Sequence, residues 1–410
     1  MYLSSGRPSA SVTHCVGLAN ALCSAGHRVT LYVLTSRETL RGLPCAPGVH
    51  RVALELGGSE DTTDLSQEAR FVRFAAQLRQ RLPRHHVHHA HDWAAARALA
   101  QARGSLSGSL VRTVHQLTGG ERALDRREAE SLRSCDLVLT VSDELRRSLN
   151  ARYGVHSERV DNGVDFARFA KPPVRDVVAL GSRLGLSSAG SLLFTYGGIS
   201  RRKNTLQVLE VFLRVLRRSA SAMWVIIGDD EAGADEQAYR AEFDARVEAA
   251  GPWVKQAITR AGTLDDAELV SSYQVADAVV CASTTTGFGL CALEALAGGA
   301  PLVAARRGPF MEYLDRDCAD LVDVDDLAEF ERVLTRVLLR ARSDDRRISA
   351  GMERARRHTW PRVAAQHVRA YGDLLFPDAS VPSAWSGAAA RETTGVIFKP
   401  GQPQRRLGSR

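Results

Sequence analysis

The sequence predicts an α/β protein with two doubly wound, Rossmann-like domains, each a parallel sheet covered by helices on both faces. Three observations support this fold class. Short apolar runs alternate with amphipathic segments of helical period, the alternation begins again near residue 190, and the 410 residues favour two or three domains. Such an alternation indicates parallel strands, because each crossover helix returns the chain to the same end of the sheet.

In the first half, apolar residues at helical spacing between Val12 and Cys23 predict a helix that ends at Gly26. A strand over residues 29–34 follows, and a second apolar stripe predicts a helix over residues 71–82. Three further strands, separated by helical stretches, are expected over residues 87–90, 110–114 and 137–141.

The beginning of the first domain departs from this pattern. A doubly wound domain opens with a buried strand, a Gly-rich turn and a helix, but only residues 1–3 precede the polar stretch over residues 4–11. We therefore expect the first strand to be a stub or absent, and the natural start to lie upstream of Met1.

The second half repeats the alternation. Strands are predicted over residues 192–196, 224–227, 278–281 and 302–305, with a leucine-striped helix over residues 206–216. A proline-interrupted stretch over residues 170–173 marks the junction between the halves. Residues after 380 are rich in Ser, Gly, Ala, Pro and Arg without a sustained period, which predicts a disordered tail.

Composition narrows the class of protein. Apolar residues make up 44% and charged residues 25%, as in soluble globular proteins, and no apolar run reaches the ~18 residues that span a bilayer. The net charge is +7; residues 377–410 carry five basic and two acidic residues, hence +3, which leaves +4 elsewhere. This excess forms no basic stripe and excludes nucleic acid as the expected partner. Seven cysteines without C-x-x-C spacing indicate reduced thiols in a cytoplasmic protein.

The stretch TGFGLCALE over residues 286–294 is the strongest candidate for binding an anion. Gly287 and Gly289 allow a tight turn and expose amides at the start of a helix, where the helix dipole stabilises negative charge. Glu294 lies in the first two turns, where a carboxylate can accept hydrogen bonds from a vicinal diol such as a ribose. The alternative is an amphipathic helix with Leu290 and Leu293 in the core and Glu294 in water.

The stretch YGGISRRKN over residues 196–204 leaves a buried strand through two glycines and presents Arg202 and Lys203 before a helix. Ligands of doubly wound sheets bind at the carboxyl ends of strands, and a cation there suits a diphosphate that gains charge as it leaves. A solvated basic turn is the alternative. The chain has four lysines against 50 arginines, so a lysine at this position favours the functional interpretation.

A histidine-rich run occupies residues 84–92, RHHVHHAHD. Strand alternation would place His86 and His88 on one face and His85 and His89 on the other. A metal site is one interpretation, but no carboxylate or cysteine cluster accompanies the run, so we predict strand-end histidines near a cleft and no metal. Separately, His115 ends a buried strand at the edge where a ligand would bind.

Together these features resemble the retaining glycosyltransferases of family 4, which have the GT-B fold of two Rossmann-like domains facing each other across a cleft. The resemblance extends to about residue 375 and includes further motifs. These are NGVD at 162–165, IIGD at 226–229, AGTL at 261–264, ADA at 276–278 leading to Ser283, and HTW at 358–360. It implies an acceptor-side domain over residues 1–172, a nucleotide-sugar-binding domain over 173–358, a helix crossing back over 359–376, and a tail over 377–410.

The resemblance implies a hexosyltransferase that moves a sugar from a nucleotide-diphosphate-sugar donor to a small-molecule, glycan or lipid-linked acceptor with retention of configuration. It implies no metal and no other cofactor. Lys203 would bind the diphosphate, the amides of Gly289 and Leu290 would cap it, Glu294 would hold the ribose, and the backbone near Thr263 would contact the base. The implied catalytic residues are Lys203 and His115, the latter facing the sugar. The implied donor-binding residues are Arg202, Thr263, Leu264, Thr286, Gly287, Phe288, Gly289, Leu290 and Glu294.

Three positions depart from the family pattern. Thr286 occupies the place of the first of two paired glutamates, the arginine usually found before the lysine falls at Gly197 or Gly198, and Ala10-Ser11 stands for a glycine pair. These departures raise the alternative of a non-catalytic or impaired relative that binds nucleotide sugar or a partner protein. Four arginines at 122, 126, 127 and 133 suggest a membrane surface, although a solvated helix face is the favoured interpretation.

Overall fold

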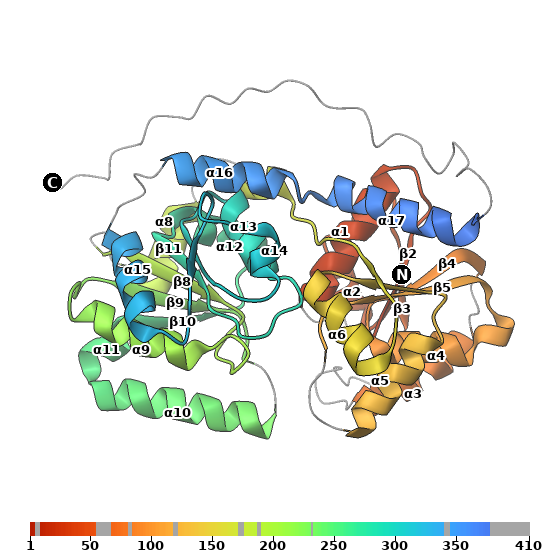
Figure 1. Ribbon diagram of the computed structural model, residues 1–410, viewed down its shortest axis with the longest axis horizontal. Coiled ribbons are helices and arrows are strands. Elements are labelled where there is room, and N and C mark those ends of the chain that lie inside the picture. The colour runs from red at the N-terminus through yellow and green to blue at the C-terminus, as the bar shows by residue number, and fades with distance from the viewer. Residues whose placement is uncertain are drawn as a thin grey trace.

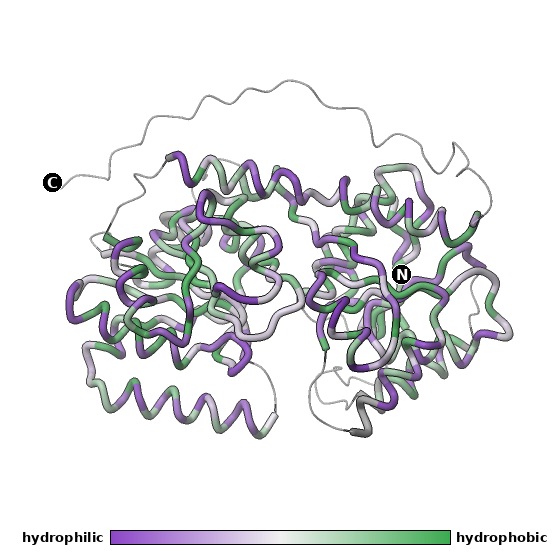
Figure 2. Tube along the Cα trace, in the orientation of Figure 1, coloured by the Kyte–Doolittle hydropathy of each residue, from purple (hydrophilic) through white to green (hydrophobic). Residues whose placement is uncertain are grey.

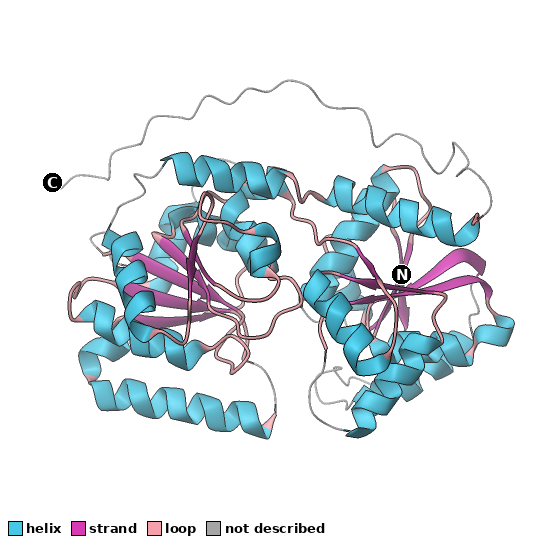
Figure 3. Ribbon diagram, in the orientation of Figure 1, coloured by secondary structure: helices cyan, strands magenta, loops and turns pink. Residues whose placement is uncertain are grey.

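The computed structural model describes residues 1–4, 9–54, 67–80, 84–117, 122–170, 176–186, 190–230, 233–339 and 345–377. Its two α/β domains lie side by side, each with a central sheet between layers of helices (Figures 1 and 3). The predicted fold class is therefore confirmed. The predicted junction is outside the described residues from residue 171 onward, and so is the predicted tail from residue 378.

The first sheet has seven strands in the order β3-β2-β1-β4-β5-β6-β7, and every neighbouring pair is parallel. The second sheet has six parallel strands in the order β10-β9-β8-β11-β12-β13. The strands are β1 Tyr2–Leu3, β2 Thr30–Leu34, β3 His50–Leu54, β4 Arg84–Ala90, β5 Ser107–Val114, β6 Leu137–Thr140, β7 Glu158–Arg159, β8 Leu192–Tyr196, β9 Met223–Ile227, β10 Ile258–Gly262, β11 Ala278–Cys281, β12 Leu302–Ala305 and β13 Asp320–Val322.

Helices connect the strands and cover both sheets. They are α1 Ala10–Ser24, α2 Arg37–Gly42, α3 Gln67–Gln80, α4 Trp93–Gln101, α5 Arg122–Arg133, α6 Asp143–Tyr153, α7 Phe166–Phe169, α8 Asp176–Leu184, α9 Thr205–Leu216, α10 Ala234–Ala250, α11 Pro252–Gln256, α12 Asp266–Val275, α13 Leu290–Ala297, α14 Phe310–Tyr313, α15 Leu327–Leu339, α16 Asp345–Arg356 and α17 Trp360–Leu375. In Figure 2 the outer helix α10 alternates hydrophilic and hydrophobic residues, because one face buries Tyr239, Phe243 and Val247. No described helix is long and apolar enough to cross a membrane.

The first strand is a stub, as expected, and it is not absent. β1 has two residues, yet it is an interior strand of the first sheet and pairs with β2 on one side and β4 on the other. The Met1 amino group donates to the carbonyl of Thr30 at 2.8 Å, and the Tyr2 ring stacks on Tyr32 with centroids 4.8 Å apart. Aromatic stacking and pairing on both sides compensate for the short length.

The strands that the apolar pattern did not predict are β3, β7, β10 and β13, besides the stub β1. These four are the edge strands of the two described sheets. An edge strand pairs on one side and is less buried, so its residues need not form an apolar run. β3 and β10 follow this rule, because Leu54 is the only buried residue in these two strands.

The carboxyl-terminal helix returns to the first domain. α16 lies along the second domain, and α17 packs against α1 (Figure 1). Trp360, at the start of α17, packs edge-on against His14 of α1 with ring centroids 5.4 Å apart. The chain therefore crosses between the domains a second time, and the two crossings limit how far the domains can separate.

Candidate active site

The loop after β8 holds Lys203 against the carboxyl edge of the second sheet. The amides of Gly197 and Gly198 both donate to the carbonyl of Ile227 in β9, at 2.7 and 3.0 Å. Lys203 then folds back over Gly197: a Cβ at position 197 would lie 2.6 Å from the lysine Cε. A side chain at this position, including the arginine typical of the family, would displace the lysine from its place.

The loop over residues 283–289 lies beside Lys203 and leads into α13. The amide of Thr284 donates to the carbonyl of Arg202 at 3.1 Å, which ties the two loops together. Gly289 precedes α13 with φ of 92°, a left-handed conformation that favours glycine. The first amides of α13 have no carbonyl partners within the helix and carry the positive end of its dipole.

Lys203 and the start of α13 line one small cavity of about 10 Å3, together with Cys281, Ser283 and Cys291. The two sulfur atoms are 3.4 Å apart, and both cysteines are free. The hydrogen bond from Cys281 and the charges of Lys203 and Arg202 lower the pKa of the Cys291 thiol to about 6. The same bond and burial raise the pKa of Cys281. Lys203 therefore lies beside the amino-terminal turn of α13, and the charges of Lys203 and Arg202 favour an anion there.

Glu294 lies on the second turn of α13 and is half-buried. The Tyr273 hydroxyl donates to its Oε2 at 2.7 Å. Burial raises the pKa of Glu294, while the bond from Tyr273 and the charges of Arg168 and Lys203 oppose that shift. The expected alternative, with Glu294 in water, is therefore wrong, because the carboxylate is held by a buried tyrosine from α12.

Thr263 and Leu264 follow β10 at the same edge of the sheet. The Thr263 hydroxyl donates to Asp229 at 3.1 Å, and Gly228 donates to the carbonyl of Gly262 at 2.8 Å. Leu264 packs against the core, and Asp265 caps α12. The loop backbone therefore has a defined position two strands away from Lys203.

The two domains meet where Gly287 approaches His115. A Cβ at position 287 would lie 1.5 Å from the His115 carbonyl oxygen, so no other residue fits without moving the domains apart. His115 follows β5 at the carboxyl edge of the first sheet and is partly exposed. The structure thus brings the backbone of His115 to the loop that leads into α13.

Other histidines of the first domain and of α17 pack around His115. The rings of His14, His91 and His115 lie 4.7 to 5.5 Å from one another, and His89 and His367 pack beside them. Burial, first of all, lowers the pKa of each of these imidazoles, to about 3 for His115 and about 4 for His367. This cluster is therefore uncharged at neutral pH.

The expected alternation of the histidine run is wrong at one position. His88 and His89 face opposite sides of the sheet, with His88 bonded to Tyr2 and His89 to Tyr371. His85, however, packs on His88 and contacts the Tyr32 hydroxyl at 3.1 Å, on the face opposite to that expected. The register of β4 with β5 shifts between Arg84 and Val87, which moves His85 to the other face.

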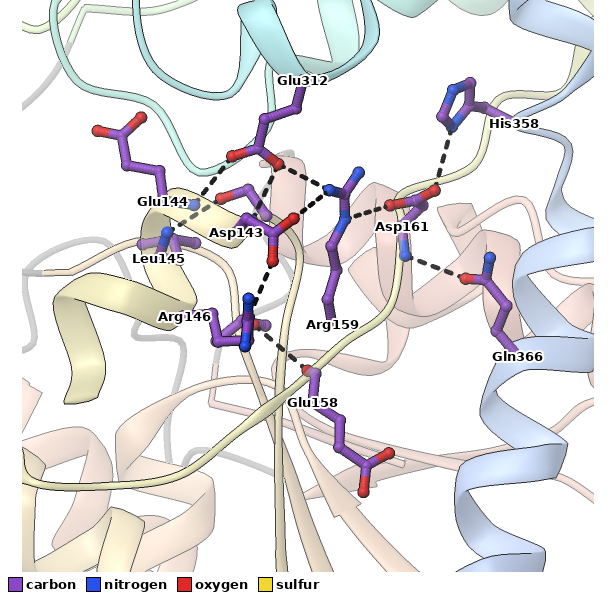
Figure 4. A network of polar contacts seen from close by, with 12 residues as sticks. Asp143, Glu144, Leu145, Arg146, Glu158, Arg159, Asp161, Glu312, His358 and Gln366 are labelled. Carbon is purple, nitrogen blue, oxygen red and sulfur yellow. Dashed lines mark hydrogen bonds and ion pairs between the residues drawn. The ribbon is translucent and has the colours of Figure 1, made fainter.

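A polar network joins the domains beside the site (Figure 4). Glu312 of the second domain accepts hydrogen bonds from the amides of Asp143 and Glu144, both at 2.9 Å, at the start of α6 in the first domain. Arg159 pairs with Glu312 at 3.0 Å and with Asp143 at 2.7 Å. The negative Glu312 therefore caps a helix of the opposite domain and is itself neutralised by an arginine.

The structure brings most of the sequence-predicted residues to one place. Arg202, Lys203, residues 286–290 and Glu294 gather at the second sheet, and His115 faces them. Ala10 and Ser11 form the first turn of α1, capped by Ser9, in place of the expected glycine turn. Sequence reasoning missed five contributors, because each acts through a partner on a different element: Tyr273, Glu312, Cys291, His14 and Asn162.

Two Rossmann-like domains, with a cationic loop and a helix amino terminus at one edge and a histidine at the facing edge, define a GT-B enzyme. Comparison with known proteins agrees. The pattern described as "Glycosyltransferase Family 4" matches residues 11–168, and "Glycosyl transferases group 1" matches residues 183–354. The chain belongs to the family 4, group 1 glycosyltransferases and is an enzyme of that family.

Relatives align over nearly the whole chain. The phosphatidyl-myo-inositol mannosyltransferase of Mycolicibacterium smegmatis is 26% identical over 94% of this chain and 95% of its own. A D-inositol 3-phosphate glycosyltransferase of Frankia alni is 29% identical over 89% and 94%. Among solved structures, sucrose-phosphate synthase from Thermosynechococcus elongatus superimposes with a TM-score of 0.74 at 19% identity, covering 92% and 98%. Anabaena HepE, in complex with UDP and glucose, has a TM-score of 0.73 at 16% identity, covering 90% and 98%.

Proposed function

We propose that this glycosyltransferase moves a sugar from a nucleotide-diphosphate-sugar donor to an acceptor hydroxyl, retains the anomeric configuration, and needs no metal ion for transfer. One observation carries the proposal. Lys203 lies over Gly197 and shares a cavity with the amino-terminal turn of α13, so a fixed cation and helix amides converge at one strand end. Such a site suits a diphosphate leaving group, whose negative charge grows in the transition state.

The remaining residues take roles along the donor. Lys203 and Arg202 neutralise the diphosphate, and the amides of Gly289 and Leu290 bind its oxygens. Glu294, oriented by Tyr273, accepts hydrogen bonds from the ribose. The backbone at Thr263 and Leu264 lies two strands away, at the distance of the nucleobase end. These positions order the donor from base to phosphate along the carboxyl edge of the second sheet.

His115 acts on the sugar from the other domain. Its carbonyl lies against Gly287, so its ring stands at the boundary between the donor loop and the first domain. Because burial keeps the imidazole neutral, it binds a sugar hydroxyl by a neutral hydrogen bond and adds no charge at the reacting centre. The acceptor enters from the first-domain side.

The names of two relatives direct the choice of acceptor. One relative is a phosphatidyl-myo-inositol mannosyltransferase and another a D-inositol 3-phosphate glycosyltransferase. We therefore place inositol, its 3-phosphate and phosphatidylinositol first among acceptors to be tested, with simple glycans and glycolipids after them.

The deciding experiment incubates the full chain with UDP-, GDP- and ADP-sugars, with and without acceptors and in the presence of a chelator. We expect one donor to raise the melting temperature and to yield a glycoside by mass spectrometry, with the donor's anomeric configuration by NMR. Inversion would exclude the retaining mechanism, and loss of transfer in the chelator would exclude metal independence. Donor binding without transfer or hydrolysis would instead support an impaired relative, to which Thr286 and Ala10-Ser11 would point.

A further inference from the structure

Three histidines from separate elements converge at the carboxyl edge of the first sheet. His14 lies on α1, His91 follows β4, and His115 follows β5. One ring nitrogen of each lies within 4.8 Å of a ring nitrogen of the other two. Only His91 belongs to the histidine-rich run. The other two lie on distant segments, so neither strand alternation nor sequence spacing could predict this group.

The hydrogen bonds leave lone pairs inside the cluster. His14 Nδ1 lies 2.5 Å from the side-chain oxygen of Asn162, which can only accept, so Nδ1 carries the proton and Nε2 the lone pair. That Nε2 is buried and has no partner in the described part of the chain. His91 faces His115 with its Nδ1, and because its Nε2 is also buried without a partner there, Nε2 can carry the proton and leave the Nδ1 lone pair to the group. An unsatisfied buried nitrogen is costly, and an oxygen on the outer nitrogen is the arrangement that orients histidines that bind metals.

Of the neighbouring histidines, His89 is engaged at both ring nitrogens and His367 at Nδ1 only. His89 contacts the Tyr371 hydroxyl at 2.6 Å and the Thr113 hydroxyl at 2.8 Å, one with each ring nitrogen. His367 donates from Nδ1 to the carbonyl of Val363 at 2.8 Å. His89 therefore offers no free nitrogen, which separates it from the three converging residues and makes it a buried control.

The separations suit a transition metal after small ring movements. Two imidazole nitrogens on one tetrahedral zinc ion, each about 2.0–2.1 Å from it, are about 3.4 Å apart. His91 Nδ1 and His115 Nε2 are 3.2 Å apart, and a separation of 4.8 Å, the widest in the group, requires two nitrogens to approach by about 1.4 Å. Neutral imidazole is the ligating form and favours zinc, copper and nickel over magnesium or calcium.

We propose that His14, His91 and His115 bind a divalent transition-metal ion of the zinc type, with Asn162 as a positioning residue. His115 is the partly exposed member, so the ion enters from the side that faces the second domain. A bound ion occupies the imidazole that the proposed function assigns to the sugar, and it therefore inhibits transfer. The inhibition rests on the proposed function, whereas the binding does not.

Binding is tested with the metal-stripped full chain titrated with Co2+, whose tetrahedral complexes absorb visible light, and then with competing Zn2+. We expect one ion per chain. His14→Asn and His91→Asn should each weaken binding at least tenfold, and Asn162→Ala should weaken it less. The controls are His86→Ala, exposed on the same histidine run, and His89→Gln, buried beside the site; both should bind as the unaltered protein does. Circular dichroism identifies any variant that fails to fold.

Equal Zn2+ affinity in the unaltered protein, His14→Asn and His91→Asn would overturn the assignment, and so would absence of one-to-one binding. The inhibition arm compares transfer with Zn2+ and after its removal by a chelator. We expect reversible inhibition, and we expect His14→Asn to need at least tenfold more Zn2+ relative to its own metal-free rate. Activation by Zn2+ would overturn the inhibitory role. If no donor supports transfer, the proposed function fails while the Co2+ titration still decides the metal site.

Discussion

The carboxyl edges of the two sheets differ in charge: neutral histidines gather at the first and cations at the second. Of the twelve histidines, ten precede residue 157, and the other two, His358 and His367, lie in the segment that returns to the first domain. The first edge therefore presents buried, neutral imidazoles. The second presents Lys203, Arg202 and a helix amino terminus, which favour anions. Under the proposed function, the uncharged edge would receive the sugar and the cationic edge the diphosphate.

The domains also differ in which segments of the chain form them. The first strand of the second domain, β8, has five residues and its exit loop carries the cation, whereas the first domain depends on the two-residue β1 and on packing by α17 from the far end of the chain. Contacts such as Glu312 with α6 join the two. The first domain is therefore completed by elements that lie outside it in sequence.

The largest expected effect is at the cationic edge. Lys203→Ala should lower kcat by about a hundredfold, ~3 kcal/mol, because the lysine meets charge that develops in the transition state. The matched control is Lys255→Ala, an exposed lysine paired with Glu248 at 3.0 Å, which should leave the rate unchanged. Steady-state kinetics with the identified donor measure both.

The same comparison applies across the cleft. His115→Ala should cost about tenfold or less, since a neutral hydrogen bond contributes ~0.5–1.5 kcal/mol. If His115→Ala lowered kcat more than Lys203→Ala, the roles proposed for the two edges would be wrong, and Arg202 would be the next cation to test.

Acid should weaken the first domain before the second. Burial lowers the pKa of His367 to about 4 and also lowers that of His88, so below pH 6.5 the unfolded chain binds protons that the folded chain does not. The contribution of these neutral histidines to the free energy of unfolding is fully present above pH 6.5 and is lost as the pH falls towards 4. At pH 5 the loss is ~2 kcal/mol for His367 alone.

Pulse proteolysis in urea at pH 7 and pH 5, read out by peptides of each domain, measures this difference. His367→Gln should remove part of the pH dependence of the first domain and none of the second. An equal loss of stability in both domains would contradict the contrast.

The pKa of Cys291 is lowered first by the hydrogen bond from Cys281 and then by the positive charges of Lys203 and Arg202 at the second edge. With a pKa of about 6, Cys291 is mostly thiolate at pH 7 and should react with iodoacetamide about threefold faster than an ordinary thiol, because its lower nucleophilicity offsets most of the gain in thiolate. Peptide mapping after short labelling identifies the modified cysteine, and bound nucleotide diphosphate should protect it. In Lys203→Ala the reaction should slow; equal rates would mean that the lysine does not face the thiol.

The polar link between domains should make a smaller contribution. Glu312→Gln removes the charge that caps α6, and the amide protons of Asp143 and Glu144 should exchange about fivefold faster, ~1 kcal/mol. Glu353→Gln breaks exposed pairs with Arg356 and Arg357 and should have no such effect. Unchanged exchange at α6 in Glu312→Gln would show that the domains are held elsewhere.

The smallest effect is expected at Thr286, where the family pattern has a glutamate. Thr286→Ala should lower transfer several-fold, because a hydroxyl contributes at most one neutral hydrogen bond. Thr286→Glu should leave the rate equal or raised, through a charge-assisted bond. A strong loss in Thr286→Ala, measured beside Lys203→Ala, would move the catalytic centre towards this loop.

The sequence alone determined the interior strands other than β1, the two doubly wound domains and the two loops of the second edge, while the GT-B arrangement followed from the family resemblance. Those features depend on local rules: apolar runs make buried strands, glycines permit turns, and a lysine before a helix stands out in an arginine-rich chain. The edge strands β3, β7, β10 and β13 escaped detection, since strands paired on one side need no apolar run.

Tertiary structure decided everything that depends on contact between distant segments. His14 and Asn162 are 148 positions apart, Glu312 and Glu144 are 168 apart, and the register shift that turns His85 over depends on pairing between β4 and β5. No periodicity records such contacts, because they arise when helices and strands pack. For the same reason, Glu294 was expected equally on a solvated or a functional face until Tyr273, folded against it from α12, held its carboxylate inside the protein.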